Sequence, residues 1–298
     1  MIDVCLLGAG GVMPLPNRAL TSLFLRYSGS AMLLDCGEGT QTALRREKVK
    51  YSSIDVILIT HLHGDHICGL TGLLLTFGLE GRVRPLKIYG PAGLRKAVDA
   101  ARVIAPELPF EIILTEIKED SLTFNEIGLT VSAFRLKHSI DCYGYRIDLK
   151  RPPKFNPQRA SELGIPKRLW GTLQRGEDVE GFHASDLGGE QRRGLSILYA
   201  TDTRPVDNIY TFGKDLDLMI LEGMYDDDGY LEKAETVCHL TMGEAVGIAR
   251  ALQPKELWLT HLSPVVTDPE ACEPRLKERF SGTVIGYDGL HKTLFFDE

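Results

Sequence analysis

Four ligand-type side chains directly follow an apolar run, and this arrangement constrains the fold more than any other feature of the chain. Residues 57–60 indicate the end of a buried strand, and His61, His63, Asp65 and His66 come next. Imidazole nitrogen and carboxylate oxygen together suit Zn²⁺ or Mn²⁺. Strand alternation sends His61 and His63 to the same side, and the turn beyond brings the other two to a neighbouring point. The segment therefore predicts a metal site at the end of a buried strand.

Three further candidate ligands follow other strand-like runs. They are His138, Asp202 and His261. Active sites of layered α/β folds gather at strand ends, so we expect these side chains to meet the first four. The count allows two ions, one on His61, His63 and His138, the other on Asp65, His66 and His261, with Asp202 bridging them.

Two divalent ions about 3.5–4 Å apart can hold a hydroxide and the oxygens of a displaced group. The ligand set therefore indicates hydrolysis. We expect two ions per chain and favour Zn²⁺, while Mn²⁺ and Fe²⁺ accept similar ligands.

The pattern of apolar segments predicts an α/β fold in which two sheets pack face to face with helices outside. Buried strands are expected at 4–7, 31–34, 54–60, 86–89, 195–200, 216–221 and 256–260, helices at 91–104, 241–252 and 269–280, and hairpin strands at 121–135 and 143–149. We expect a single domain over residues 1–298.

One insertion, at about residues 150–194, breaks this rhythm. It is rich in polar residues, Pro and Gly, and it shows no convincing apolar stripe. Between positions 150 and 176 it carries seven basic residues against the single acid Glu162, although the whole chain has a net charge of −7. A long insertion without its own core is usually functional or disordered.

Composition limits the remaining classes. The six cysteines include no CxxC pair, which argues against a disulfide framework or a cysteine-based zinc site. No apolar stretch approaches the ~20 residues that span a bilayer, and the N-terminus has no secretory signal pattern. The sequence predicts a cytoplasmic protein without a membrane association.

The metal-ligand segment resembles the hallmark His-x-His-x-Asp-His of the metallo-β-lactamase superfamily, here His61-Leu62-His63-Gly64-Asp65-His66. The resemblance continues along nearly the whole chain with the ribonuclease Z family, endonucleases that trim the 3′ trailer from precursor tRNA. It is carried by Leu6 to Gly11, Pro14 to Arg18, Leu34 to Gln41, Thr60 to Gly72, Tyr89 to Pro91, Tyr143 to Arg146, Asp202 to Arg204 and Leu259 to His261.

This resemblance implies an αβ/βα sandwich and the division of metal ligands given above. It also implies that Asp65 orients or deprotonates the attacking water. Glu222 and His239 match the acid pair of the family, in which His239 would protonate the leaving oxygen and Glu222 would fix its tautomer.

The basic insertion falls where bacterial members carry an arm that grips tRNA. In that family the arm of one subunit serves the active site of the other, so the resemblance implies precursor tRNA as substrate and a homodimer; no other protein partner is indicated. The candidate tRNA contacts are Lys150, Arg151, Lys154, Lys167, Arg168 and Arg175.

Two other functions remain open at this point. One is a phosphodiesterase or related hydrolase for a smaller substrate, favoured by the acidic total charge and by altered residues around Glu222 and His239. The other is a non-catalytic RNA-binding or scaffold protein, with Phe155 and Trp170 stacking on bases. An ordered, projecting basic arm would favour RNA, and a lid folded over the cleft would favour a small substrate.

Overall fold

Two seven-stranded sheets form the centre of the protein. The computed structural model describes residues 1–226 and 229–297. The N-terminal sheet has the strand order β14-β1-β2-β3-β4-β5-β6, and the C-terminal sheet has the order β13-β12-β11-β10-β9-β8-β7. The N-terminal sheet consists of β1 (Ile2–Gly8), β2 (Ser22–Tyr27), β3 (Ser30–Leu34), β4 (Ile54–Leu58), β5 (Leu86–Pro91), β6 (Ile112–Ile117) and β14 (Leu290–Leu294). The C-terminal sheet consists of β7 (Ser121–Glu126), β8 (Leu129–Arg135), β9 (Tyr143–Arg151), β10 (Arg192–Ala200), β11 (Leu218–Glu222), β12 (Leu257–Thr260) and β13 (Thr283–Ile285).

Because side chains alternate along a strand, each sheet contributes to two apolar cores, one on each of its faces. In β9 the side chains of Tyr143, Tyr145, Ile147 and Leu149 all belong to the core between the sheets. The intervening Arg146 is partly exposed on the opposite face. The period of two therefore places every second residue of the strand between the two sheets.

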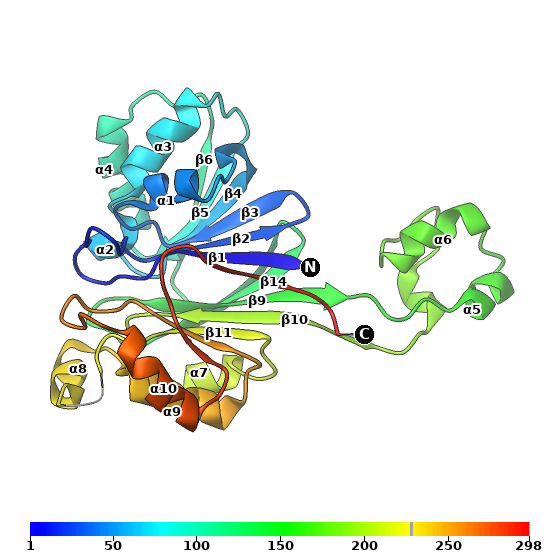
Figure 1. Cartoon of the computed structure of the whole chain (residues 1–298). Helices are drawn as coiled ribbons and strands as arrows, with labels where there is room; N and C mark the ends of the chain where they lie inside the picture. The colour runs from blue at the N-terminus through cyan, green and yellow to red at the C-terminus, as the bar shows by residue number, and fades with distance from the viewer. Residues whose placement is uncertain (227–228, 298) are drawn as a thin grey trace.

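Helices cover the outer face of each sheet, as Figure 1 shows. A separate apolar core lies between each sheet and its helices. The N-terminal sheet carries α1 (Thr40–Arg46), α2 (Gly64–Ile67), α3 (Leu70–Leu79) and α4 (Leu94–Ile104), and the C-terminal sheet carries α7 (Asp207–Phe212), α8 (Leu231–Val237), α9 (Met242–Leu252) and α10 (Glu273–Arg279). This is the αβ/βα sandwich, and the predicted fold class is confirmed. No described helix is long and apolar enough to cross a membrane.

Each predicted buried strand coincides with an observed one to within a few residues, but two predicted helices begin late. The helix expected from residue 91 begins at Leu94, because Pro91 still pairs with Ile117 in the sheet. The helix expected from 269 is a 3₁₀ turn, Glu270–Cys272, followed by α10. The short strands β2, β6, β13 and β14 and the apolar helix α3 were not predicted.

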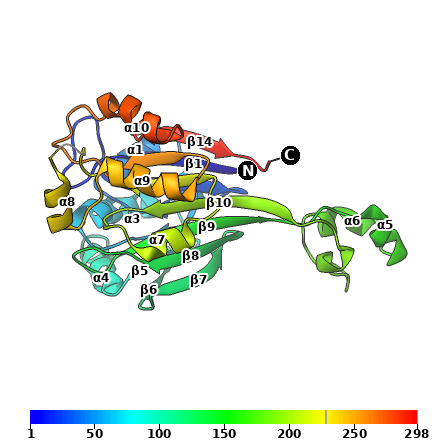
Figure 2. The ribbon, with the colours of Figure 1, turned by 90° about the horizontal axis from the view of Figure 1, so that it is seen from below.

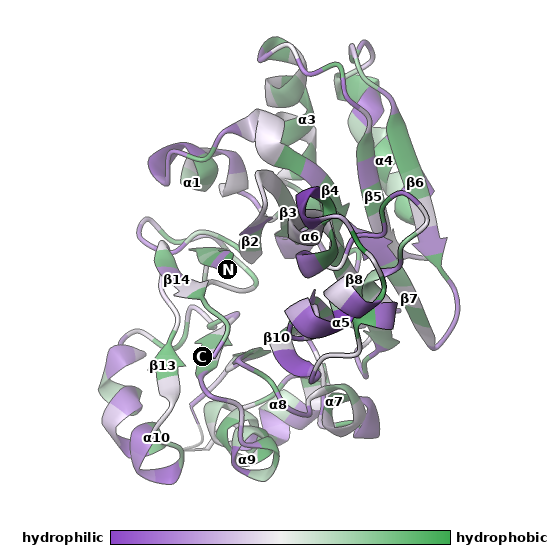
Figure 3. Ribbon diagram, turned by 90° about the vertical axis from the view of Figure 1, so that its right-hand side faces the viewer, coloured by the Kyte–Doolittle hydropathy of each residue, from purple (hydrophilic) through white to green (hydrophobic). Residues whose placement is uncertain are grey.

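The insertion forms an arm on an extended two-stranded ribbon. Strands β9 and β10 pair antiparallel as far as Arg151 and Arg192, and the chain between these residues contains α5 (Pro157–Glu162), α6 (Lys167–Gln174) and the 3₁₀ turn Ala184–Leu187. Figure 2 shows the arm projecting well away from the body. Seen end-on in Figure 3, the ribbons of α5 and α6 contain many hydrophilic residues.

The arm has a small core of its own, which corrects the expectation from sequence. Its buried members and the aromatic residues packed on them all lie between positions 155 and 187. Phe155 and Trp170 pack on each other with ring centroids 5.4 Å apart, so the rings expected to stack on bases contribute to this core instead. The apolar stripe was missed because α5 has six residues and α6 eight, too few for a clear helical period.

Candidate metal centre

The loop after β4 delivers the first four candidate ligands. The strand pairs in parallel with β3 on one side and β5 on the other, so its carboxyl end is held from both sides. His61 is fully buried, His63 occupies the N-cap of α2, and Asp65 and His66 lie in that short helix. The predicted turn is therefore a helix start, and it brings His61 and His63 to one group of ligand atoms and Asp65 and His66 to a neighbouring group.

One group of ligand atoms gathers around His63. Its Nδ1 atom lies 3.1 Å from His61 Nε2 and 3.1 Å from His138 Nε2. Asp202 Oδ1 is 3.7 Å from the His61 nitrogen and 3.8 Å from the His138 nitrogen. A tetrahedral ion with Zn–N bonds of 2.0–2.1 Å places its ligand atoms about 3.3 Å apart, so these separations match the edges of a coordination tetrahedron.

A second group faces the other oxygen of the same carboxylate. Asp202 Oδ2 lies 3.1 Å from His66 Nε2 and 3.4 Å from His261 Nε2. Asp65 Oδ2 is 3.2 Å from the His261 nitrogen and 3.7 Å from the His66 nitrogen. The structure thus brings together all seven predicted ligands, in the two predicted groups, with one oxygen of Asp202 directed to each.

Two buried polar atoms without a hydrogen-bond partner in the described part of the chain indicate where a cation fits. Among the described residues, His66 Nε2 and Asp202 Oδ2 are buried side-chain atoms without a hydrogen-bond partner. Buried polar groups are almost always hydrogen-bonded, so two facing orphans need another partner. Their mixed nitrogen and oxygen chemistry fits a divalent metal ion.

The protonation of these histidines follows from the buried carboxylates. Burial lowers the pKa of His261, but Asp202 and then Asp65 outweigh burial and raise the pKa to about 10. Burial also lowers the pKa of His66, and Asp202 and Asp35 likewise raise it well above its ordinary value. The carboxylates therefore demand positive charge at this point, which a metal ion supplies by displacing the protons.

Asp35 supports the centre from behind, a role that was not predicted from the sequence. Its Oδ2 accepts hydrogen bonds from His66 Nδ1 at 2.8 Å and from the Tyr199 hydroxyl at 3.0 Å. Its Oδ1 accepts from the Thr60 backbone N–H at 2.8 Å. A carboxylate bonded to the far nitrogen of a ligand histidine fixes the tautomer and the ring orientation. The signal was present, because Asp35 directly follows the buried strand β3.

Glu222 and His239 form a buried pair beside the ligands. His239 Nδ1 donates to Glu222 Oε2 at 2.7 Å, while Glu222 Oε1 accepts from the Thr203 backbone N–H at 2.6 Å. Burial lowers the pKa of His239, yet the negative charge of Glu222 outweighs it and raises the pKa above its ordinary value. The second nitrogen of His239, Nε2, is left for the cavity, so this imidazole can carry a proton to it.

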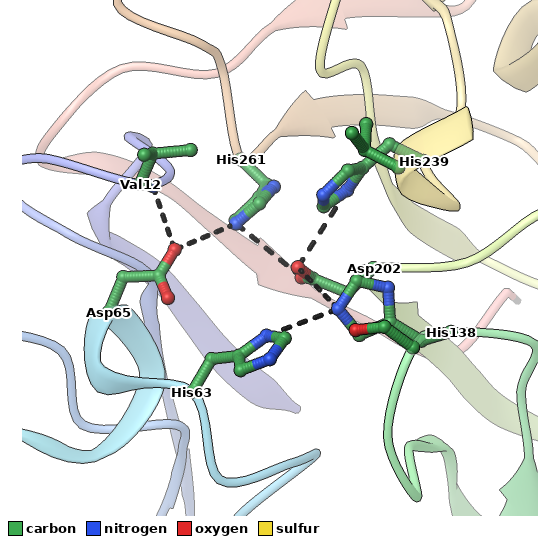
Figure 4. A pocket seen from close by; sticks show the side chains of 9 residues that line it. Val12, His63, Asp65, His138, Asp202, His239 and His261 are labelled. Atoms are coloured by element: carbon green, nitrogen blue, oxygen red, sulfur yellow. Dashed lines mark hydrogen bonds and ion pairs between the residues drawn. The ribbon is translucent and has the colours of Figure 1, made fainter. Parts of the chain in front are cut away.

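A cavity of about 380 Å³ opens onto the two ligand groups and His239. Figure 4 shows His63, Asp65, His138, Asp202, His239 and His261 pointing toward one another, with Val12 above Asp65. The lining residues are Val12, His63, Asp65, His138, Ser139, Asp202, Val237, His239 and His261. None of them belongs to the arm, so the arm is not a lid on this cavity.

The predicted arm contacts lie far from the cavity, and three of the six form hydrogen bonds or ion pairs within the protein. Arg168 forms a two-bond ion pair with Glu180, and Arg175 forms one with Glu177. Arg151 donates to the Asp297 carbonyl oxygen at 2.6 Å. Lys150, Lys154 and Lys167 are exposed.

The chain is similar to known proteins in sequence and in structure. The chain is 45% identical to "Ribonuclease Z" of Agathobacter rectalis, with 100% of both chains covered. It is 42% identical to "Ribonuclease Z" of Clostridium acetobutylicum, covering 100% of this chain and 99% of that one. A model of the family "Anti-Pycsar protein Apyc1" matches residues 2–101, about a third of the chain.

Solved structures are similar over almost the whole length. The short form of human tRNase Z superposes with a TM-score of 0.73 at 27% identity, covering 98% of both chains. The metallo-β-lactamase fold protein YhfI of Bacillus subtilis gives a TM-score of 0.71 at 20% identity, covering 98% of both chains. This second likeness shows the fold alone.

The support from Asp35 can be tested by Asp35→Asn. Asparagine tolerates the left-handed backbone at this position, where φ is +59°, but its neutral amide is a poorer acceptor for His66. We expect zinc affinity to fall roughly 10–100-fold. A competitive titration against a chromophoric chelator measures this affinity.

Asp217→Asn is the matched control. Asp217 is also a buried carboxylate, paired with Arg193 and Lys255 away from the metal centre. This variant should lower thermal stability and leave zinc affinity unchanged. Wild-type zinc affinity in Asp35→Asn would contradict the supporting role.

Proposed function

This chain belongs to the ribonuclease Z family, and we propose that it is a dinuclear zinc endoribonuclease that removes the 3′ trailer from precursor tRNA. The observation that carries the proposal is the pair of ligand groups that share Asp202 on the wall of an open cavity. Phosphodiester hydrolysis needs positive charge at the phosphate, an oriented water and a proton for the leaving oxygen. The cavity offers residues for each of these tasks.

We assign two ions per chain, the first to His61, His63, His138 and Asp202 and the second to Asp65, His66, His261 and Asp202. Five of the seven side chains are imidazoles, which favours Zn²⁺ over harder ions. When bound, such ions neutralise phosphate oxygens and lower the pKa of water toward neutrality.

We propose that Asp65 is a ligand of the second ion and that it orients or deprotonates the attacking water. Its Oδ2 accepts the Val12 backbone N–H at 2.7 Å, which fixes the carboxylate at the mouth of the cavity. Its pKa is lowered: burial acts to raise it, but the hydrogen bond from His261 and the charge of His66 outweigh burial. The carboxylate is therefore ionised, as a metal ligand and an acceptor of a hydrogen bond from the attacking water must be.

His239 is proposed as the general acid. Glu222 holds its Nδ1–H and stabilises the imidazolium, so that Nε2–H can be donated to the leaving oxygen. Arg204 donates to the backbone carbonyl of His239 and pairs with Glu244 at the start of α9, which holds the histidine against the cavity wall.

The arm supports a large substrate over a small one. It projects away from the body, and its exposed lysines can contact phosphates without reading sequence (Figure 2). Such a feature is of no use to a substrate that fits a 380 Å³ cavity. The paired arginines remain available as well, because exposed ion pairs are weak and a phosphate can replace the carboxylate.

The arm also supports a homodimer. It leaves the sheet at the Arg151 end of β9, whereas the cavity lies beyond the Tyr143 end, nine residues or about 30 Å away. An arm in this position cannot touch the cavity of its own chain. In a symmetric dimer it can hold an RNA whose scissile bond lies in the partner's cavity.

Exposed aliphatic side chains supply a candidate dimer surface. Leu79 at the end of α3 is 89% exposed and Val103 near the end of α4 is 81% exposed. Leu75, Val83 and Ile104 are exposed in the same region. An apolar patch of this kind marks an interaction site in soluble proteins.

Incubation with a 3′-extended precursor tRNA tests the activity directly. We expect one cut near the end of the acceptor stem, abolished by a chelator and restored by zinc. Asp65→Asn should reduce the rate at least about 100-fold while the fold is retained, because the variant loses a charged ligand and a proton acceptor at little change in volume. Intact precursor in the presence of active hydrolysis of bis-p-nitrophenyl phosphate would instead favour the smaller-substrate reading.

Replacement of Lys150, Lys154 and Lys167 by glutamine tests the arm. We expect weaker binding of precursor tRNA and a flatter salt dependence, by roughly 0.7–0.9 in log–log slope for each lost phosphate contact. Turnover of bis-p-nitrophenyl phosphate should stay unchanged, since the metal centre is intact. Extending the change to Arg151, Arg168 and Arg175 should weaken binding further.

The control for the arm is replacement of Arg45, Lys48 and Lys50 by glutamine, an equal loss of charge at the end of α1. Equal weakening by this control would show that the effect is a general one of net charge. Unchanged tRNA binding in the lysine variant would remove the arm from the proposal.

A mixing experiment tests the dimer. One variant has Asp65→Asn and an intact arm, and the other has residues 152–191 replaced by a short glycine–serine turn and an intact cavity. Each should be nearly inactive on precursor tRNA alone. An equimolar mixture should regain activity through heterodimers, up to about one quarter of wild type, because random assortment makes half of the dimers heterodimers and each has one working cavity.

Leu79→Glu with Val103→Glu should abolish the rescue and give a monomer by light scattering. Activity of the armless variant equal to wild type, or a monomeric wild-type protein, would contradict the dimer proposal.

A further inference from the structure

A strained turn lies at the mouth of the cavity, and it presents an exposed valine to the space above the metal centre. Val12 has a φ of +70°, a region that β-branched residues almost never occupy. Its side chain lines the cavity together with Val237 at the end of α8, and the residue is 54% exposed. Strain of this kind persists only where the surroundings enforce it, and it is concentrated at functional sites.

The backbone shows what enforces the turn. The Met13 N–H donates to the Gly11 carbonyl oxygen at 2.9 Å, which closes a three-residue γ-turn with Val12 at its centre. A γ-turn with positive φ is the rare and strained form. At the same time the Val12 N–H donates to Asp65 Oδ2 at 2.7 Å. The turn is therefore tied to a proposed catalytic carboxylate.

The segments on both sides of the turn are anchored. Gly11 donates to the Leu262 carbonyl oxygen, and a Cβ atom on Gly11 would come within 2.6 Å of the His261 ring. The carboxylate of Asp288 accepts from the backbone N–H of Ala9 and of Ala19, which clamps the two ends of the loop. The loop cannot relax the strain by moving away from the metal centre.

Hydrogen bonding to Asp65 does not require a side chain at position 12. A glycine would donate the same N–H and would adopt the same φ without strain. The isopropyl group therefore adds strain and exposed apolar surface, and neither stabilises the free protein. A contact that the side chain makes only with bound substrate accounts for both the backbone strain and the exposed apolar surface.

We propose that Val12 is a substrate-contacting residue that determines where the RNA is cut. Its isopropyl group and that of Val237 form an aliphatic clamp at the cavity mouth, which packs on the unpaired nucleoside adjacent to the scissile phosphate. The contact is sequence-tolerant, since an aliphatic surface packs on any base or ribose, and it sets the register of the chain over the ions. This inference rests on the proposed ribonuclease function.

Val12→Gly tests the inference, because it removes the side chain and keeps the N–H. We expect Tm to rise by roughly 1–3 °C as the strain is released. For precursor tRNA we expect kcat/KM to fall roughly tenfold, with additional cuts at neighbouring phosphates. Zinc affinity, measured by competitive titration against a chromophoric chelator, should stay at the wild-type value, which would show that Asp65 and the other candidate ligands are undisturbed. Val12→Ile, which keeps an aliphatic side chain, should cut at the wild-type position.

Ser28→Gly is the matched backbone control. Ser28 also has a positive φ, of +50°, but lies in the tight β2–β3 turn outside the cavity lining. Its replacement should leave cleavage unchanged. A Val12→Gly protein with the wild-type cut site and kcat/KM would overturn the proposal. If the wild-type protein cuts no precursor tRNA, the proposed function itself fails, and the two failures are thereby distinguished.

Discussion

The buried carboxylate of Asp202 is the interaction on which the rest of the site depends. One oxygen faces His61 and His138, and the other faces His66 and His261. His61 and His66 come after β4 of the N-terminal sheet. His138 and His261 come after strands of the C-terminal sheet. Asp202 therefore ties together the ends of two sheets, and neither sheet could form the centre alone. An ionised group buried in this way needs compensating positive charge, so the same residue that organises the fold at this edge also favours a bound cation.

Backbone strain is concentrated around this centre. Val12, Asp35, Asp202 and His261 all have positive φ, and so does Cys238, whose carbonyl oxygen accepts the Nδ1–H of His138. A non-glycine residue with positive φ costs conformational free energy. Several such residues lie together here because the packing of the surrounding sheets enforces their backbone conformation. The strain turns the side chains out of the strands and toward one another. Two apolar cores outside the sheets and one between them supply the rigidity that this arrangement requires.

The sequence was sufficient wherever one local rule decided the outcome. Ligand-type residues directly after buried strands identified His61, His138, Asp202 and His261 as a convergent set. The same rule applies to Asp35, yet a single carboxylate after a strand is usually a cap or a turn residue, and only its bonds to His66 and Tyr199 reveal its function. Short edge strands such as β13, with three residues, carry too little pattern to be recognised. The γ-turn at Val12 could not be predicted at all, because valine is among the residues least suited to it and tertiary contacts impose it.

The separation between the arm and the metal centre has a mechanical consequence. The arm has its own small core, so its shape does not depend on the body, while the paired strands β9 and β10 make its attachment stiff. The same two strands run into the interior, where Tyr145 donates to the Ile59 carbonyl oxygen and Tyr199 to Asp35, directly behind the ligand loop. One continuous ribbon thus carries the exposed lysines of the arm at one end and supports the candidate ligand histidines at the other. Affinity for a long RNA and chemistry at a single phosphate can therefore be altered independently, since they share a rigid support and no side chains.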